Sequence, residues 1–384
     1  MFLDEVQAAP HALQALRYLY EDRPELPVLA AGSLLEFTLA DHPFPMPVGR
    51  IEYLHLGPMS YFEFLNATDP GAAEQLAALD LDTPLAEAAH RRQLRRCREY
   101  LLVGGLPEAV LAHRETAGSP LEVAAVHRSI AETYQDDFAK YARGSQLVRL
   151  QRLFRSIPGS VGRKVAYHTL DADSRSGEVR DAIELLVKAR ICNRVVHSHC
   201  SGLPLGAGID HRTYKLLFLD VGLMNHVCGV DAPAVDAMDD TRLVNEGSIA
   251  EQYVGQELAS FGGGERRPEL HYWLRQGRKG NAEVDYVISR GDWILPIEVK
   301  AGRSGSMKSL LQFAHEKPPP LAVRFDANPP SLQTIRHTIR TANALQPVTL
   351  QLLSLPLYAV QSLPRLIDHL RTKQHASDTL LPNR

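Results

Sequence analysis

Two short runs rich in β-branched residues, 282–288 and 294–300, are joined by a Gly-containing tetrapeptide. This pattern predicts a β-hairpin. Because side chains alternate along a strand, Glu298 and Lys300 project from one face, and Asp285 on the partner strand lies within reach of that face. Two carboxylates and an ammonium group that converge on a strand pair predict a divalent-metal site suited to phosphodiester hydrolysis.

Other segments show the periodicities of helices and of buried strands. Apolar spacing predicts helices over 11–22, 120–141, 148–157, 178–189, 247–258 and 304–313, with a further short helix starting near 164–167. Short apolar runs predict strands over 27–31, 51–56, 191–196 and 215–219. Three helices followed by a strand between 148 and 196 indicate a winged helix-turn-helix. The third of these helices mixes acids and cations, which favours a structural or partner-contact role over nucleic-acid binding.

Composition narrows the class of protein. A length of 384 residues predicts about two or three domains, and a net charge of −3 gives no global electrostatic footprint for nucleic acid. Four cysteines without CxxC spacing favour a reducing cytoplasm over a disulfide framework. No run approaches the roughly 20 apolar residues of a membrane span. The sequence therefore predicts a cytoplasmic protein without a membrane partner.

The N-terminus has the pattern of a nucleotide-binding core. An apolar strand ends at Asp4-Glu5, which is the Walker B arrangement for holding Mg²⁺ and polarising water. A second strand ends at Gly32-Ser33, and Gly49-Arg50 precedes a third. The phosphate-cradling motif G-x-x-x-x-G-K-[ST] does not occur, and the Gly-Arg-Lys at 162–164 and at 277–279 is not followed by Ser or Thr. This polypeptide is therefore not expected to bind ATP tightly.

These segments, together with Pro-Met-Ser-Tyr-Phe-Glu-Phe at 58–64, resemble the second half of prokaryotic AAA-type ATPases that carry the domain of unknown function 4143. The resemblance implies that Asp4 and Glu5 are the Walker B acids, that Ser33 is a sensor, and that Arg50 is an arginine finger or sensor. It implies ATP as a cofactor only if a P-loop is supplied upstream.

The C-terminal part of that family in turn resembles the PD-(D/E)xK nuclease-like fold. The order helix–Glu, strand–Asp, strand–Glu-x-Lys matches this fold. By that match Glu251 is the helix acid, Asp285 and Glu298 are ligands of Mg²⁺ or Mn²⁺, and Lys300 positions or activates water. Basic residues at 273–280 could guide a phosphate backbone toward the site.

The expected fold class is α/β, in four parts. Residues 1–115 form a truncated P-loop or AAA-type core, 116–205 a helical, winged-helix-like middle, 206–330 a restriction-endonuclease-like α/β domain, and 331–384 an extension with a disordered tail. The leading hypothesis is metal-dependent binding or cleavage of DNA or RNA. The alternatives are a non-enzymatic interaction or regulatory module with a protein partner, and an ATPase whose true start lies upstream.

Two other polar clusters have weaker signals. The basic run 90–98 could form a phosphate-binding helix face, although such runs are usually solvated. His197, His199 and Cys200 share a short segment, but the recognised spacing of four zinc ligands is absent. We expect a polar strand end there rather than a zinc site.

Overall fold

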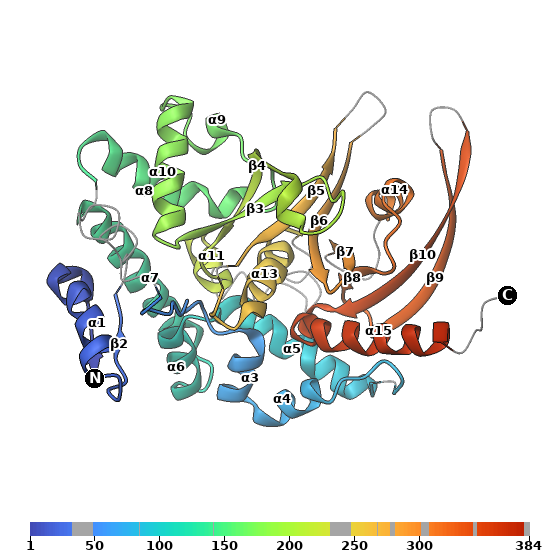
Figure 1. Ribbon diagram of the computed structural model, residues 1–384, viewed down its shortest axis with the longest axis horizontal. Helices are drawn as coiled ribbons and strands as arrows, with labels where there is room; N and C mark the ends of the chain where they lie inside the picture. The colour runs from blue at the N-terminus through green and yellow to red at the C-terminus, as the bar shows by residue number, and fades with distance from the viewer. Residues whose placement is uncertain are drawn as a thin grey trace.

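The largest feature of the molecule is an eight-stranded mixed sheet with the order β4-β3-β5-β6-β7-β8-β10-β9 (Figure 1). Its strands are β3 (Cys192–Ser198), β4 (Ile209–Phe218), β5 (Leu270–Arg275), β6 (Ala282–Arg290), β7 (Trp293–Val299), β8 (Ala322–Asp326), β9 (Ser331–Arg340) and β10 (Leu345–Pro356). The computed structural model describes residues 1–32, 49–83, 85–140, 142–230, 247–266, 268–276, 281–300, 307–340 and 344–379.

Helices surround this sheet and account for most of the chain before β3. Figure 1 shows α8, α9 and α10 gathered beside β3 and β4, and α3 to α6 below the sheet. The helices are α1 (Pro10–Asp22), α3 (Tyr61–Thr68), α4 (Pro70–Ala77), α5 (Glu87–Val103), α6 (Pro107–Glu115), α7 (Pro120–Asp137), α8 (Ser145–Ser156), α9 (Tyr167–Leu170), α10 (Ser176–Lys188), α11 (Val221–Val227), α13 (Gly247–Ala259), α14 (Lys308–Glu316) and α15 (Leu363–Thr379).

The predicted hairpin is confirmed as β6 and β7, which pair antiparallel from Tyr286 opposite Ile297 to Arg290 opposite Trp293. Gly291 sits in the turn with a φ of 60°, a left-handed conformation that glycine adopts without steric strain. Strand β8 then runs parallel to β7, so the chain must cross over between them, and α14 forms that crossover. The succession is α13–β5–β6–β7–α14–β8.

Two core clusters occupy the two faces of the central strands. Leu295 and Ile297 of β7 belong to the larger cluster, which includes the apolar side chains of α13. Ile294 packs against the second cluster, which contains Phe313 and its neighbours on α14. Since neighbouring side chains on a strand point to opposite faces, α13 and α14 lie on opposite sides of the sheet.

The predicted order of three helices and a strand in the middle of the chain is confirmed as α8, α9, α10 and β3. These elements join the same sheet as the C-terminal strands, because β3 runs parallel to β5 and antiparallel to β4. The boundary expected at 205/206 falls between β3 and β4, and β9 and β10 of the expected extension are strands of this sheet. The winged-helix assignment of the middle stays a prediction.

The N-terminal strands form a separate two-stranded sheet. β1 (Phe2–Leu3) runs parallel to β2 (Leu29–Ala30), which confirms a strand within 27–31. The strand expected over 51–56 was wrong. These residues have no ladder partner among the described strands, and the His55 amide donates to the carbonyl of Gly264 instead. Without a neighbouring strand, a short run with alternating apolar residues does not become part of a sheet.

Candidate functional site

A buried lysine lies where β4, α13 and β6 meet. The Lys215 side chain is only 1% exposed, and its Nζ lies 2.7 Å from Glu251 Oε1 and 2.5 Å from Glu283 Oε1. Sequence reasoning missed Lys215 and Glu283. The available signals were a lysine at the head of the apolar run 215–219 and an acid two residues before Asp285, on the same side of its strand.

A β-bulge directs Asp285 toward this lysine. Between the pairs His271–Val287 and Trp273–Val284, β5 has one residue and β6 has two. The extra residue places Asp285 and Tyr286 on the same side of the sheet, and bulges of this kind commonly re-aim side chains next to functional sites. The Tyr286 hydroxyl donates to the Glu251 carbonyl at 2.7 Å, and Asp285 Oδ2 accepts from the Val299 amide, also at 2.7 Å.

The end of β7 completes the cluster. Lys300 Nζ forms an ion pair with Glu298 Oε1, as their shared strand face predicts. The side chain of Glu298 is 5% exposed, and its Oε2 has no hydrogen-bond partner within the described part of the chain. The structure thus brings all four predicted C-terminal residues together with the two that were missed. We call this group the acid–lysine cluster: Lys215, Glu251, Glu283, Asp285, Glu298 and Lys300.

Burial and mutual repulsion hold protons on the acids of the cluster. Burial raises the pKa of Glu251 to about 7, against the opposing effect of the Lys215 ammonium. Burial also raises the pKa of Glu298 to about 8, and the charge of Asp285 raises it further while Lys300 lowers it. Desolvation also raises the pKa of Asp285, which is half-buried. Three of the four carboxyl groups therefore resist ionisation.

Lys215, by contrast, stays charged. Burial disfavours the charged form of Lys215, but the charges of Glu251, Asp285 and Glu283 outweigh burial and raise its pKa above the usual range. Four carboxyl groups share two ammonium groups in the cluster. When all six side chains are ionised the cluster carries a net negative charge, and a bound cation would neutralise it.

The cluster offers few ligands for a metal ion. Among the described residues, no group of three or more His, Cys, Asp or Glu side chains is placed to hold a metal ion. The Asp285–Glu298 pair is the part of the cluster that fits best. One Glu298 oxygen has no partner in this part of the structure, and the Asp285 charge acts directly on Glu298. Mg²⁺ commonly uses one or two carboxylates and keeps several waters.

The predicted nucleotide site at the N-terminus is described only in part. Asp4 and Glu5 directly follow β1 and are exposed to solvent. Ser33 lies outside the described residues. Arg50 contacts Glu21 at the end of α1, with 2.7 Å between the guanidinium nitrogen and the carboxylate oxygen. The roles expected for these four residues stay predictions.

The two weaker clusters make structural contacts. From the basic run on α5, Arg92 and Arg96 contact Asp69 at 2.6 and 2.9 Å, so part of that run ties α5 to the start of α4. His197 Nδ1 accepts from the Leu274 amide at 3.3 Å, which links the end of β3 to β5. In the predicted basic loop at 273–280, Arg275 pairs with Glu316 at 2.9 Å, and 277–280 lie outside the described residues.

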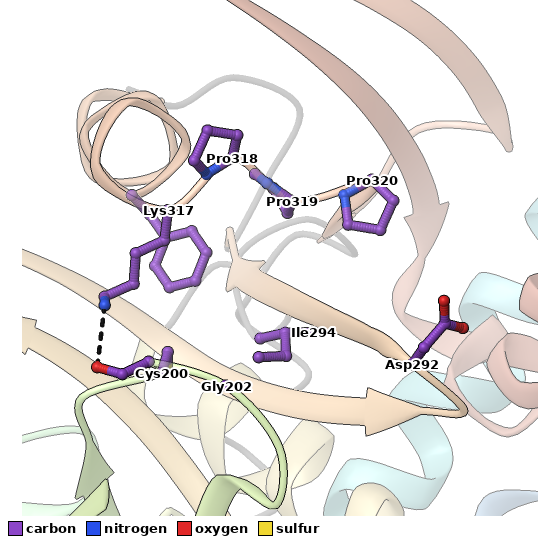
Figure 2. Close-up of a pocket in the computed structure, with 10 residues that line it drawn as sticks. Cys200, Gly202, Asp292, Ile294, Lys317, Pro318, Pro319 and Pro320 are labelled. Atoms are coloured by element: carbon purple, nitrogen blue, oxygen red, sulfur yellow. Dashed lines mark hydrogen bonds between the residues drawn. The ribbon is translucent and has the colours of Figure 1, made fainter.

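Two hollows lie away from the acid–lysine cluster. One of them has a volume of about 260 Å³. Figure 2 shows that Lys317 reaches toward the loop that contains Cys200, across from Asp292. The Lys317 ammonium donates to the Ser201 hydroxyl at 3.4 Å. Burial raises the pKa of Cys200 to about 11, so its thiol is not a ready nucleophile. A larger cavity of about 650 Å³ lies between residues 54–58, the end of α10 and the end of α13.

Three family models match separate parts of the chain. An AAA domain matches residues 1–65, a domain of unknown function (DUF8612) matches 94–234, and another (DUF4143) matches 246–339. The expected AAA-type segment and domain 4143 are both found, and the match to domain 8612 over the helical middle was not foreseen. No curated protein and no solved structure matches the chain.

None of the helices in the described ranges is both long enough and apolar enough to cross a membrane.

Proposed function

We propose that this AAA-related protein uses its C-terminal sheet to bind nucleic acid, or to hydrolyse its phosphodiester bonds, in a metal-dependent manner. The observation that carries the proposal is the acid–lysine cluster itself. Four acids and two lysines from α13, β4, β6 and the end of β7 converge, and Lys215, Glu251 and Glu298 among them are buried. Burying a carboxyl group costs free energy, and such clusters with shifted pKa values are concentrated at functional sites.

The succession of elements supports the same proposal. The order is α13–β5–β6–β7–α14–β8, with three antiparallel strands and a fourth parallel to the third. It agrees with the order helix–Glu, strand–Asp, strand–Glu-x-Lys by which the sequence resembles the PD-(D/E)xK fold. Glu251 lies on the first helix, Asp285 on the second strand, and Glu298 and Lys300 at the end of the third. These are the positions that the resemblance assigns to the acids and the lysine.

Four of the six residues of the cluster then have a distinct task. Asp285 and Glu298 would hold Mg²⁺ or Mn²⁺, which when bound supplies positive charge and lowers the pKa of water. Lys300, paired with Glu298, lies where it can orient an attacking water or a phosphate oxygen. Lys215 fixes the side chain of Glu251 and offsets part of the buried negative charge.

The test compares Asp285→Asn with Asp292→Asn, an acid in the turn of the same hairpin that contacts Arg371. Both changes remove one carboxylate, but only Asp285 belongs to the cluster. Plasmid and single-stranded DNA are incubated with each protein in Mg²⁺ and in Mn²⁺. We expect cleavage by the parent and by Asp292→Asn and none by Asp285→Asn. Equal cleavage by both variants would remove Asp285 from the site.

A non-enzymatic interaction module is the second candidate, and exposed apolar side chains near the N-terminus favour it. Phe2 on β1 and Leu29 on β2 are 64% and 67% exposed, and Leu56 is 85% exposed. Light scattering on the parent and on a Phe2→Ser/Leu29→Ser variant tests this candidate. Self-association that disappears in the variant supports an interface, and a monomer in both cases removes this support. ATP binding at Asp4 and Glu5 is proposed only together with a P-loop.

A further inference from the structure

A Gly-Arg-Lys segment from the helical middle lies directly against the acid–lysine cluster. Lys164 forms an antiparallel bridge with Lys215, and the Val165 amide donates to the Tyr214 carbonyl at 2.9 Å. Gly162 has a φ of 81°, and a Cβ at this position would lie 2.8 Å from Glu251 Oε2. A residue without a side chain is therefore required where this loop meets the cluster.

The two cations of this segment face outward. Arg163 and Lys164 are exposed, whereas Lys215 and Glu251 next to them are buried. Residues paired in an antiparallel bridge project from the same side, so Lys164 extends on the side from which Lys215 reaches the acids. Within the described residues, neither Arg163 nor Lys164 forms an ion pair.

We propose that residues 162–164 form a phosphate-backbone clamp for the nucleic acid that reaches the acid–lysine cluster. This inference rests on the proposed function and names the surface by which that site would hold its substrate. Exposed cations at the edge of a site attract a polyanion and hold its phosphates close to that site. One phosphate of the nucleic acid lies at the acid–lysine cluster, and Arg163 and Lys164 bind the neighbouring backbone phosphates.

The position of the segment distinguishes it from the other basic stretches. On α5, Arg92 and Arg96 are engaged with Asp69, and in β5 Arg275 is engaged with Glu316. The segment at 162–164 is also fixed in place, because its backbone is bonded to β4 on one side and Gly162 leaves no room for a Cβ beside Glu251 on the other. A clamp built on fixed backbone loses less entropy on binding than one built on a free loop.

The experiment measures the anisotropy of a fluorescein-labelled DNA duplex and of a labelled single strand, each titrated with the full chain at several salt concentrations. Arg163→Ala/Lys164→Ala is expected to weaken binding roughly tenfold at low salt and to reduce the slope of log affinity against log salt by about two. Arg163→Lys/Lys164→Arg keeps both charges and should bind as the parent does. All variants are compared with the parent by thermal unfolding, so that a folding defect is recognised.

The matched control is Arg91→Ala/Arg95→Ala, which removes the same charge from exposed positions of α5. We expect less than a twofold change. A parent that binds neither probe, or an equal loss in both double variants, overturns the clamp.

The two proposals fail separately. If Asp285→Asn abolishes metal binding while Arg163→Ala/Lys164→Ala binds DNA normally, only the clamp is wrong. If the parent binds DNA through Arg163 and Lys164 but Asp285→Asn changes nothing, only the metal-dependent site is wrong.

Discussion

One pair of carboxylates in this molecule directly follows a strand and another pair lies on two strands, and their surroundings differ. Asp4 and Glu5 follow β1, which pairs with β2 over two residues, and both acids are exposed. Asp285 and Glu298 lie on a seven-residue strand and its longer partner, within an eight-stranded sheet covered by α13. Water stabilises the charges of the first pair, whereas in the second pair Glu298 is buried and Asp285 is half-buried, both among other charges.

The comparison shows that the pKa of an acid on or after a strand is shifted strongly only when other elements enclose that acid. Burial and the neighbouring acids raise the pKa values of Glu251 and Glu298 to about 7 and 8. Lys215 reaches this site from β4, which precedes α13 in the sequence. At Asp4 and Glu5 we find no comparable enclosure in the described residues, so the C-terminal cluster carries the functional proposal.

The largest effect is expected from Lys215→Met. The change removes the only ammonium in contact with both Glu251 and Glu283, within the described residues, and leaves two acids without their buried partner. Breaking a buried ion pair from one side costs about 3–5 kcal/mol of unfolding free energy. Urea unfolding followed by circular dichroism measures this loss. Lys140→Met removes an exposed lysine and serves as the control. A loss below 1 kcal/mol, or one equal to that of the control, would show that Lys215 does not hold the cluster together.

A moderate effect is expected from pH in the absence of metal. In the folded chain Glu251 and Glu298 keep their protons up to about pH 7 and 8, whereas in the unfolded chain they release them near 4.5. The folded state therefore holds more protons in this window, and these groups reduce stability as the pH rises from 5 to 8. One unit of pKa shift corresponds to about 1.4 kcal/mol.

The Glu298→Gln variant isolates one of these groups. Several histidines have pKa values lowered by burial and act in the opposite direction, so the informative quantity is the difference between parent and variant. Urea midpoints between pH 5 and 8 in EDTA should fall less steeply for Glu298→Gln. Parallel curves for the two proteins would mean that Glu298 does not titrate in this range.

The smallest effect is expected at the N-terminal pair. Asp4→Asn/Glu5→Gln changes two exposed side chains and should alter the unfolding free energy by no more than about 0.5 kcal/mol. The same urea titration measures this change. A loss of several kcal/mol would show that these acids make structural contacts comparable to those of the cluster, and the contrast between the two regions would disappear.

Local signals in the sequence predicted the hairpin, the helices and the placement of Glu298 beside Lys300, because each follows from periodicity over a few residues. The ion pair between Lys215 and Glu251 was not predictable in this way, since it depends on β4 joining the sheet through β3. The bulge that directs Asp285 also depends on the register between β5 and β6. The unpaired segment 51–56 failed as a strand prediction for the same reason, because pairing is a property of two segments and not of one.

The most direct test of the account is a calorimetric titration of Mg²⁺ and Mn²⁺ into the parent, into Glu298→Ala and into Asp4→Asn/Glu5→Gln. We expect binding by the parent, a loss of at least about tenfold in affinity in Glu298→Ala, and no change in the N-terminal variant. Absence of binding by the parent, or equal binding by Glu298→Ala, would contradict a metal site in the acid–lysine cluster and would favour the interaction module.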